Sequence, residues 1–301
     1  MLDPPLIVDV KRHSLEDGPG IRSVVFFKGC PLRCVFCQNP EAQDLHVEIA
    51  YRADRCVGCG ACVTACPAGA VDRATPERIL RRRCDACGKC ADACPSSALA
   101  TIGRAYVVDE LVELLMRDEP YYRHSRGGVT FSGGECTMFP DYLETLARAL
   151  HARKVHLVVE TSGDFPGAWF VERILPLVDA IYFDVKIADP AQHRLHTGRD
   201  NQRIRDNLTL LMRTAPDRVQ VRIPLVPGIT ATPENLAELA FCLRERGVRS
   251  AVLLPYNPLG AQMATRLGRP LPPIPDGFMG KDEHAAAVAL FKALAVQTAS
   301  P

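Results

Sequence analysis

The sequence of 301 residues has no long hydrophobic run and no excess of charge of either sign. No apolar stretch approaches the roughly 20 residues that a membrane-spanning helix needs, and residues 1–14 lack the apolar segment of a signal peptide. The formal net charge of +1 predicts no general attraction to nucleic acid or to an anionic membrane. We therefore expect a cytoplasmic protein, with one large core and a smaller accessory domain.

Cysteine is the informative residue type. The chain has 13 cysteines, and eleven of them form three tight groups before residue 95. A disulfide framework is typical of short secreted chains, whereas spacings of two and three residues suit thiolates that bind one inorganic centre. The three groups therefore indicate metal centres. The two remaining cysteines, Cys136 and Cys242, are expected to be buried structural thiols.

Residues 52–100 contain an internal repeat of the form C-x2-C-x2-C-x3-C-P, whose two copies begin 28 residues apart. This form matches the bacterial two-cluster ferredoxin run, in which the fourth cysteine binds the other cluster. A zinc module more often uses two separated C-x2-C pairs. Whether the clusters relay electrons or are structural stays open. The predicted 4Fe–4S ligand sets are Cys56, Cys59, Cys62 and Cys94 for one cluster, and Cys84, Cys87, Cys90 and Cys66 for the other.

The rest of the chain alternates apolar, β-rich runs with helical patterns. The predicted strands span residues 23–27, 129–131, 156–160, 180–186, 219–226 and 251–256. The predicted helices span residues 108–117, 141–153, 167–177, 203–213, 233–246 and 282–296, with an irregular loop at 269–280. Such alternation predicts a parallel α/β sheet, open or curled into a partial barrel, with chemistry at the carboxyl ends of its strands.

A third cysteine group, Cys30, Cys34 and Cys37, follows the first predicted strand in a C-x3-C-x2-C pattern. Three thiolates hold three irons of a 4Fe–4S cluster, and no fourth cysteine is near in the sequence. One iron is then open to a chelating ligand, as in other catalytic metal sites. The alternatives are a zinc knuckle and an electron-transfer cluster with a distant fourth ligand.

The run Asp17-Gly18-Pro19-Gly20-Ile21-Arg22, together with the run from Gly29 to Pro40, carries a resemblance that covers essentially the whole chain. These residues resemble the opening signature of glycyl-radical enzyme activating enzymes, within the radical S-adenosylmethionine superfamily. The resemblance implies a partial (β/α)6 barrel of the radical S-adenosylmethionine type with an inserted bacterial-ferredoxin-like domain. The implied domains are residues 1–50 and 103–301 for the barrel, and 51–102 for the insert.

The resemblance also implies where S-adenosylmethionine binds. In this family the open iron chelates the amino and carboxylate groups of its methionine part. Phe36 would lie against the adenine, although core packing is the alternative, and Asn39 is a further candidate contact. Gly133, Gly134 and Glu135 match the G-G-E motif that contacts the amino group. Glycines allow close backbone approach, and we expect their amide N–H groups to be free for the ligand.

Asp184 and Lys186 share one face of a predicted strand end and resemble the D-x-K motif of the family. There the lysine meets the S-adenosylmethionine carboxylate, and the aspartate helps to hold a monovalent cation; a solvated strand end is the alternative. Glu160 and the carbonyl group of Tyr182 are further candidates for that cation. Arg222 would approach the nucleoside or the carboxylate. Asn257 stands where several relatives carry a histidine that contacts the cofactor, so its role is open.

By this resemblance the chain reductively cleaves S-adenosylmethionine to methionine and a 5′-deoxyadenosyl radical. The radical takes a hydrogen from a glycine of a partner glycyl-radical enzyme. The expected cofactors are three 4Fe–4S clusters, S-adenosylmethionine and a monovalent cation near Asp184. Flavodoxin or ferredoxin is the expected reductant. It would dock on Arg78, Arg81, Arg82 and Arg83, for which a solvated helix face is the alternative. The rival functions are a radical enzyme with a small-molecule substrate and a non-catalytic electron-transfer protein.

Overall fold

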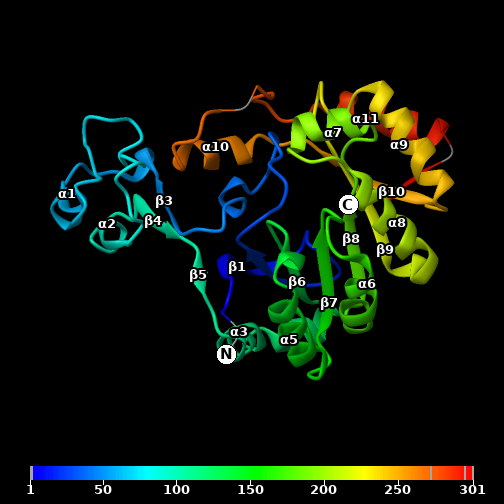
Figure 1. Ribbon diagram of the computed structural model, residues 1–301, viewed down its shortest axis with the longest axis horizontal. Helices are drawn as coiled ribbons and strands as arrows, with labels where there is room; N and C mark the ends of the chain where they lie inside the picture. The colour runs from blue at the N-terminus through cyan, green and yellow to red at the C-terminus, as the bar shows by residue number, and fades with distance from the viewer. Residues whose placement is uncertain (1–2, 272, 295, 300–301) are drawn as a thin grey trace.

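A nine-stranded sheet forms the centre of the protein in the computed structural model, which describes residues 3–271, 273–294 and 296–299 (Figure 1). Its strands lie in the order β11-β10-β9-β8-β7-β6-β2-β1-β5. From β2 to β10, six neighbouring strands run parallel, which confirms the predicted parallel α/β sheet. The sheet is open, with β11 and β5 at its edges. The strands are β1 (Leu6–Ser14), β2 (Arg22–Phe27), β5 (Arg104–Ala105), β6 (Gly128–Gly133), β7 (His156–Thr161), β8 (Ala180–Asp184), β9 (Val219–Leu225), β10 (Ser250–Pro255) and β11 (Gln297–Ala299).

Helices connect the parallel strands and bury their apolar faces against the sheet. In α5, for example, Leu143, Leu146 and Leu150 recur at helical spacing and are fully buried. The helices are α3 (Val108–Met116), α4 (Glu119–Ser125), α5 (Pro140–His151), α6 (Gly167–Trp169), α7 (Pro190–Thr197), α8 (Gln202–Thr214), α9 (Pro233–Glu245), α10 (Leu259–Arg266) and α11 (Lys281–Ala293). No helix in the described ranges is both long enough and apolar enough to span a bilayer.

Several predicted boundaries differ from the structure. The predicted helix at 167–177 is broken into α6, a π-helical turn (Phe170–Ile174) and a 3₁₀ turn (Leu175–Leu177). Pro176 has no amide hydrogen, which accounts for the end of the helical pattern in the last of these turns. The antiparallel strand β1, the helices α4, α7 and α10, and the short strands β3 (Glu48–Tyr51), β4 (Leu99–Ile102), β5 and β11 were not predicted. Pro272 of the predicted loop and Ala295 of the predicted last helix lie outside the described residues.

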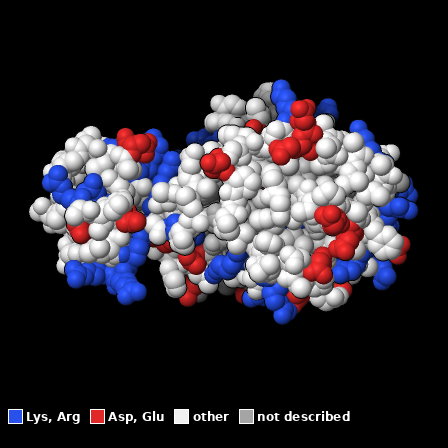
Figure 2. All heavy atoms as spheres, turned by 90° about the horizontal axis from the view of Figure 1, so that it is seen from above, with Lys and Arg blue, Asp and Glu red and all other residues white. Residues whose placement is uncertain are grey.

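A smaller lobe branches from the chain between β2 and β6. It comprises β3 (Glu48–Tyr51), α1 (Ala61–Ala65), α2 (Lys89–Asp92) and β4 (Leu99–Ile102), and its two strands pair antiparallel. The lobe has an apolar cluster of its own, which includes Ile49, Val71 and Ile79. Figures 1 and 2 show this insert beside the main body, with α10 lying toward it.

A network of charged side chains, of which Lys28 is fully buried, joins the insert to the main body. Lys28, which follows β2 and is fully buried, lies 2.7 Å from Glu48 at the start of β3. Arg269, after α10, lies 2.7 Å from both Glu48 and Asp44. Arg81 of the insert donates hydrogen bonds to the carbonyl groups of Ile49 and Arg266. The root of the insert is thus held by segments from both ends of the chain.

Candidate functional site

Two loops meet at the carboxyl edge of the sheet, one after β2 and one after β6. The amide of Gly134 donates to the carbonyl of Phe27, and the amide of Glu135 to that of Gly29, both at 2.8 Å. A Cβ atom on Gly134 would lie 2.2 Å from the Gly29 oxygen, and one on Gly133, at φ +104°, 2.4 Å from the Phe27 backbone. The expectation that the Gly134 amide is free for a ligand is therefore wrong, because packing against the β2 loop uses it.

Glu135 is fully buried and fastens the loop after β6 to the end of β7. Its carboxylate accepts hydrogen bonds from the hydroxyls of Thr137, Thr161 and Ser162 at 2.7, 2.9 and 2.6 Å, and from the Ser162 amide at 2.8 Å. Burial raises the pKa of Glu135, and these donors oppose that rise. Its predicted contact with a ligand amino group stays a prediction, since its oxygens already have protein partners.

The cysteines of the C-x3-C-x2-C group lie on the loop after β2, where all three are half-buried. Burial raises the pKa of Cys30, Cys34 and Cys37 to about 12 in each case, and Lys186 partly opposes this. A bound metal ion would remove the protons, because a coordinating thiol is deprotonated. Among the described residues no three His, Cys, Asp or Glu side chains are placed for a single metal ion. A cubane cluster does not need such a placement, because each thiolate binds a different iron.

A row of four side chains of alternating charge lies beside these cysteines: Lys186, Asp184, Arg222 and Glu160. Lys186 lies 3.0 Å from Asp184, and Arg222 lies 2.6 Å from Glu160 and 3.5 Å from Asp184. Burial alone would lower the pKa of Lys186, but Asp184 and Cys34 raise it above its usual value. Among the described residues, Asp184 Oδ1 is buried without a hydrogen-bond donor. Arg222 Nε faces this oxygen as an ion pair at 3.5 Å without forming a hydrogen bond, so the oxygen can still bind a ligand or cation.

Glu160 ends the charged group on the side of β7. It also accepts a hydrogen bond from the Ser132 hydroxyl, and burial raises its pKa in spite of Arg222. The guanidinium carbon of Arg222 lies 5.2 Å from the centre of the Tyr182 ring, which fits a cation–π contact. The predicted cofactor residues Asp184, Lys186 and Arg222 are thus brought together with Glu160. Tyr182 contributes its ring here, and the role of its carbonyl group stays a prediction.

Three further predicted residues lie on the same side of the sheet. Phe36 is 4% exposed and packs against Val226 and Tyr256, which follow β9 and β10. The side chain of Asn257 accepts from the Leu259 amide at the start of α10, and its carbonyl accepts from Gln38. Asn39 precedes a 3₁₀ turn (Pro40–Ala42) without a side-chain capping bond. Their contacts with a cofactor stay predictions.

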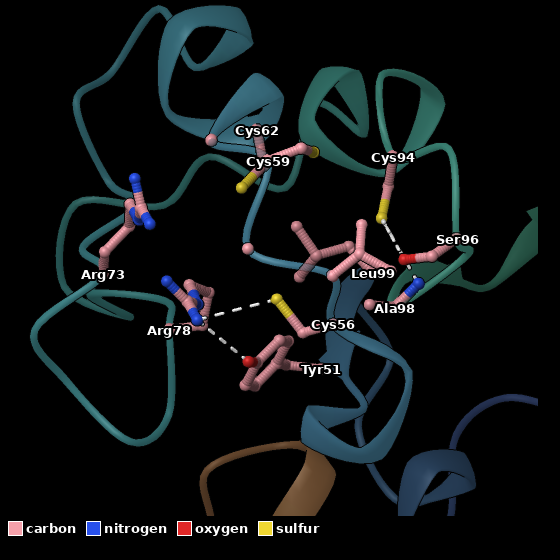
Figure 3. A pocket seen from close by; sticks show the side chains of 13 residues that line it. Tyr51, Cys56, Cys59, Cys62, Arg73, Arg78, Cys94, Ser96, Ala98 and Leu99 are labelled. Atoms are coloured by element: carbon pink, nitrogen blue, oxygen red, sulfur yellow. Dashed lines mark hydrogen bonds between the residues drawn. The ribbon is translucent and has the colours of Figure 1, made fainter.

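The insert contains a hollow of about 380 Å³, part of it open to solvent, which is shown in Figure 3. Its cysteines are the predicted first ligand set, with the fourth supplied by the second copy of the repeat. Near the other set, burial and then the neighbouring Cys84 and Cys66 raise the pKa of Cys90 to about 11. Both groups of cysteines are therefore compatible with a ligand set whose fourth cysteine comes from the other copy of the repeat. The cysteines that line the hollow are Cys56, Cys59, Cys62 and Cys94.

Sequence reasoning missed several residues that shape the site. Ser132, Thr161 and Ser162 could have been recognised from the sequence, since each lies just after a predicted strand, where functional side chains were expected. Cys136 is buried as expected. Cys242 is only half-buried, so the prediction was wrong for this residue, because its position on α9 leaves it at the edge of the core.

The comparisons with known proteins agree on one family. The family model described as "Radical SAM superfamily" matches residues 24–240. The chain is 38% identical over 274 residues to the indoleacetate decarboxylase activating enzyme of Tractidigestivibacter scatoligenes, covering 87% of this chain and 86% of that protein. It is 41% identical to the benzylsuccinate synthase activating enzyme of Thauera aromatica, over 88% of this chain and 82% of that protein. It is 42% identical to the isethionate sulfite-lyase activating enzyme of Nitratidesulfovibrio vulgaris, over 88% of both.

Among solved structures, the fold is similar to a radical SAM methyltransferase from Sphaerobacter thermophilus. The TM-score is 0.56 at 15% identity, and the match covers 100% of this chain and 77% of that one. At this identity the likeness shows the fold alone.

Proposed function

Because this chain belongs to the radical S-adenosylmethionine superfamily, among the activating enzymes of glycyl-radical enzymes, we propose that it abstracts a hydrogen from one glycine of a partner enzyme. A 4Fe–4S cluster with one open iron supplies the electron that cleaves bound S-adenosylmethionine to methionine and the 5′-deoxyadenosyl radical. The observation that carries the proposal is the position of Cys30, Cys34 and Cys37 beside the Lys186–Asp184 pair, at the carboxyl edge of the parallel sheet.

The residues of the chain divide the binding of S-adenosylmethionine among them. The three cysteines hold the cluster, and Lys186 provides a cation for the methionine carboxylate. Asp184, whose Oδ1 is buried without a donor among the described residues, serves a monovalent cation together with Glu160 and the Tyr182 carbonyl. Phe36 offers an apolar face to the adenine, with Asn39, Arg222 and Asn257 near the nucleoside. We place Gly133, Gly134 and Glu135 on the other side of the proposed S-adenosylmethionine site.

The insert, residues 51–102, is proposed as a ferredoxin-like domain with two further 4Fe–4S clusters, between barrel segments 1–50 and 103–301. The hollow lined by four cysteines from both copies supports this assignment. The insert carries eight Lys and Arg side chains and five Asp and Glu side chains, and Figure 2 shows cationic side chains gathered on its surface. Of the arginines predicted to form the docking patch, Arg82 and Arg83 are exposed, whereas Arg78 and Arg81 are half-buried and hydrogen-bonded within the protein, in a segment that is not helical. The exposed cations of the insert suit an acidic flavodoxin or ferredoxin as electron donor.

Transfer of deuterium from the partner tests the reaction. A partner enzyme labelled with deuterium at the glycine α-carbon should pass the label into 5′-deoxyadenosine, because the radical takes hydrogen from that carbon. A doublet in the electron paramagnetic resonance spectrum should appear on the partner. Benzylsuccinate synthase, isethionate sulfite-lyase and indoleacetate decarboxylase, after which relatives are named, form the first panel.

A partner whose glycine is replaced by alanine serves as the control and should give neither signal. If label enters 5′-deoxyadenosine only from a deuterated small metabolite, and no glycyl-radical protein is ever labelled, the proposed reaction is wrong. A radical enzyme with a small-molecule substrate would then take its place.

Removal of the charges at the end of β8 should weaken the binding of S-adenosylmethionine. Lys186→Ala and Asp184→Ala each delete one charge-assisted contact, which is worth about 1.5–3 kcal/mol, or roughly ten- to a hundredfold in affinity. Isothermal titration under anaerobic conditions measures the change, and the iron content should not alter. Arg194→Ala, an exposed arginine on α7 paired with Asp200, is the matched control. Unchanged affinity in both variants would show that the pair does not contact S-adenosylmethionine.

A further inference from the structure

We propose that the two clusters of the insert are unequal, and that Arg78 and Ser96 raise the reduction potential of one above that of the other. The inference rests on the proposed function, because it takes the insert to hold two cubanes. The cluster of higher potential is the one held by Cys56, Cys59, Cys62 and Cys94.

Arg78 is directed at the sulfur of a predicted ligand. Its Nη2 lies 3.7 Å from Cys56 Sγ and 3.0 Å from the Tyr51 hydroxyl, and its guanidinium carbon lies 5.2 Å from the centre of the Tyr51 ring (Figure 3). Within the described residues, Arg78 Nε is buried and has no hydrogen-bond acceptor. The guanidinium is thus fixed by Tyr51 with one nitrogen on a sulfur and a second donor still available.

Ser96 supplies the second polar contact to the same set. Its hydroxyl lies 3.7 Å from Cys94 Sγ, which also accepts from the Ala98 amide at 3.2 Å. Cys56 and Cys94 come from different copies of the repeat, so the donors approach the hollow from both sides (Figure 3).

The repeat provides an internal reference for these contacts, because a shift of 28 residues relates the two halves of the insert. The pairing of Tyr51 with Leu99 has its image in the bridge between Ile79 and Val71. The bond from the Ala98 amide to Cys94 has its image in the bond from the Ala70 amide to Cys66, also at 3.2 Å.

Glycine contacts follow the same relation. Arg73 faces Gly60, a Cβ on which would lie 3.5 Å from Arg73, whereas Thr101 faces Gly88. The backbone of the two halves is therefore equivalent, and differences between the two cluster sites come from side chains.

Side chains at equivalent positions of the two halves differ in a consistent way. Hydrogen-bond donors stand at the first cluster site, and residues without such donors stand at the equivalent positions of the second. The counterpart of Arg78 is Ala50, and the counterpart of Ser96 is Ala68. The second site also has the carboxylate of Asp85 where the first has Val57. The cation near the second set is Arg81, whose guanidinium donates to the carbonyl groups of Ile49 and Arg266 and, within the described residues, to no sulfur.

A cation and a hydroxyl donor at the sulfurs stabilise the reduced cluster more than the oxidised one, because reduction adds negative charge. Net charge and hydrogen bonds to sulfur are among the factors that set the potentials of such clusters. The first electron to enter the insert therefore settles on the cluster beside Arg78. The other cluster is reduced only afterwards.

A redox titration followed by electron paramagnetic resonance tests this order. The full-length chain with alanine at Cys30, Cys34 and Cys37 is used, so that only the insert clusters titrate. Two separate potentials are expected. Arg78→Gln should lower the higher one, with the reduced fraction at a fixed potential falling about tenfold, or 59 mV for one electron. Ser96→Ala should lower it by less, and Arg78→Lys should retain part of the effect.

The internal repeat supplies the converse experiment. Ala68→Ser places a hydroxyl where the second site lacks one, and it should raise the lower potential only. Arg82→Gln removes an exposed arginine of the same segment and should move neither potential.

Iron analysis separates the two ways in which the result can fail. If the variant with alanine at Cys30, Cys34 and Cys37 binds fewer than about eight irons, the insert does not hold two cubanes and that part of the proposed function is wrong. If it binds about eight, but Arg78→Gln and Ser96→Ala leave both potentials unchanged, the inequality is not due to these residues and the inference is overturned. Should Arg78→Gln fail to assemble, Ser96→Ala and Ala68→Ser decide the matter in the same way.

Discussion

Replacing Cys30, Cys34 and Cys37 together with alanine is expected to abolish the formation of 5′-deoxyadenosine. The wild-type chain should bind about twelve irons as three cubanes, and the variant about eight. The physical reason is the separation of the sites, since the triad lies on the loop after β2, whereas the other ligand sets lie in the insert with its own apolar cluster. Iron analysis and chromatographic detection of 5′-deoxyadenosine measure the two quantities.

Cys242→Ala is the matched control for that experiment, because Cys242 is a half-buried thiol on α9 outside all three groups. Its iron content and turnover should equal those of the wild type. Wild-type protein that is folded and holds only about four irons would contradict the assignment of the insert. A triad variant that still forms 5′-deoxyadenosine would contradict the catalytic role of these cysteines.

The second large effect is expected on stability. Glu135→Ala would leave the hydroxyls of Thr137, Thr161 and Ser162 and the Ser162 amide without their buried acceptor. Since each unsatisfied donor costs about 1–3 kcal/mol, and the losses are not additive, the free energy of unfolding should fall by about 3–5 kcal/mol. Glu135→Gln retains the shape and one acceptor oxygen, and should lose less.

Urea denaturation of the anaerobic protein measures these changes. Glu110→Ala, which removes an exposed partner of Arg104, is the control and should leave the midpoint unchanged. Equal midpoints for Glu135→Ala and wild type would mean that the carboxylate does not hold the loops together. In Glu135→Gln, the affinity for S-adenosylmethionine then reports separately on the predicted contact with the amino group.

The six parallel strands from β2 to β10 could be predicted because each is a short apolar run that is buried in the core. Strand β1 was not predicted, because only the first part of Leu6–Ser14 is apolar and charged or polar residues make up most of the rest. It lies between β2 and the edge strand β5. The strand predicted at 180–186 ends at Asp184. Lys186 nevertheless lies 3.0 Å from that residue, so the proximity of the two side chains was predicted correctly although the element boundary was wrong.

Several contacts between residues far apart in the sequence could not be predicted from the sequence. A lone lysine after a strand reads as a solvent-exposed end, yet Lys28 is fully buried because Glu48 and the Glu41 carbonyl accept from it. The G-G-E motif indicated a place in the site but not that the Gly134 amide bonds to Phe27. The crossed ligand sets of the insert stay predictions, although Cys94 of the second copy does line one hollow with Cys56, Cys59 and Cys62 of the first.

The two-stranded connection of the insert has a consequence for how this protein tolerates change. Its entering strand β3 and leaving strand β4 are hydrogen-bonded to each other, with Glu48 opposite Ile102 and Tyr51 opposite Leu99. For the main sheet, the whole insert is a loop closed at its base. The entropy of closing a loop rises only with the logarithm of its length, about 0.6 kcal/mol per doubling. A short hairpin turn grafted between Tyr51 and Leu99 would preserve the Glu48 contact with Lys28, so the lobe is a segment that evolution or an engineer can exchange without reordering the sheet.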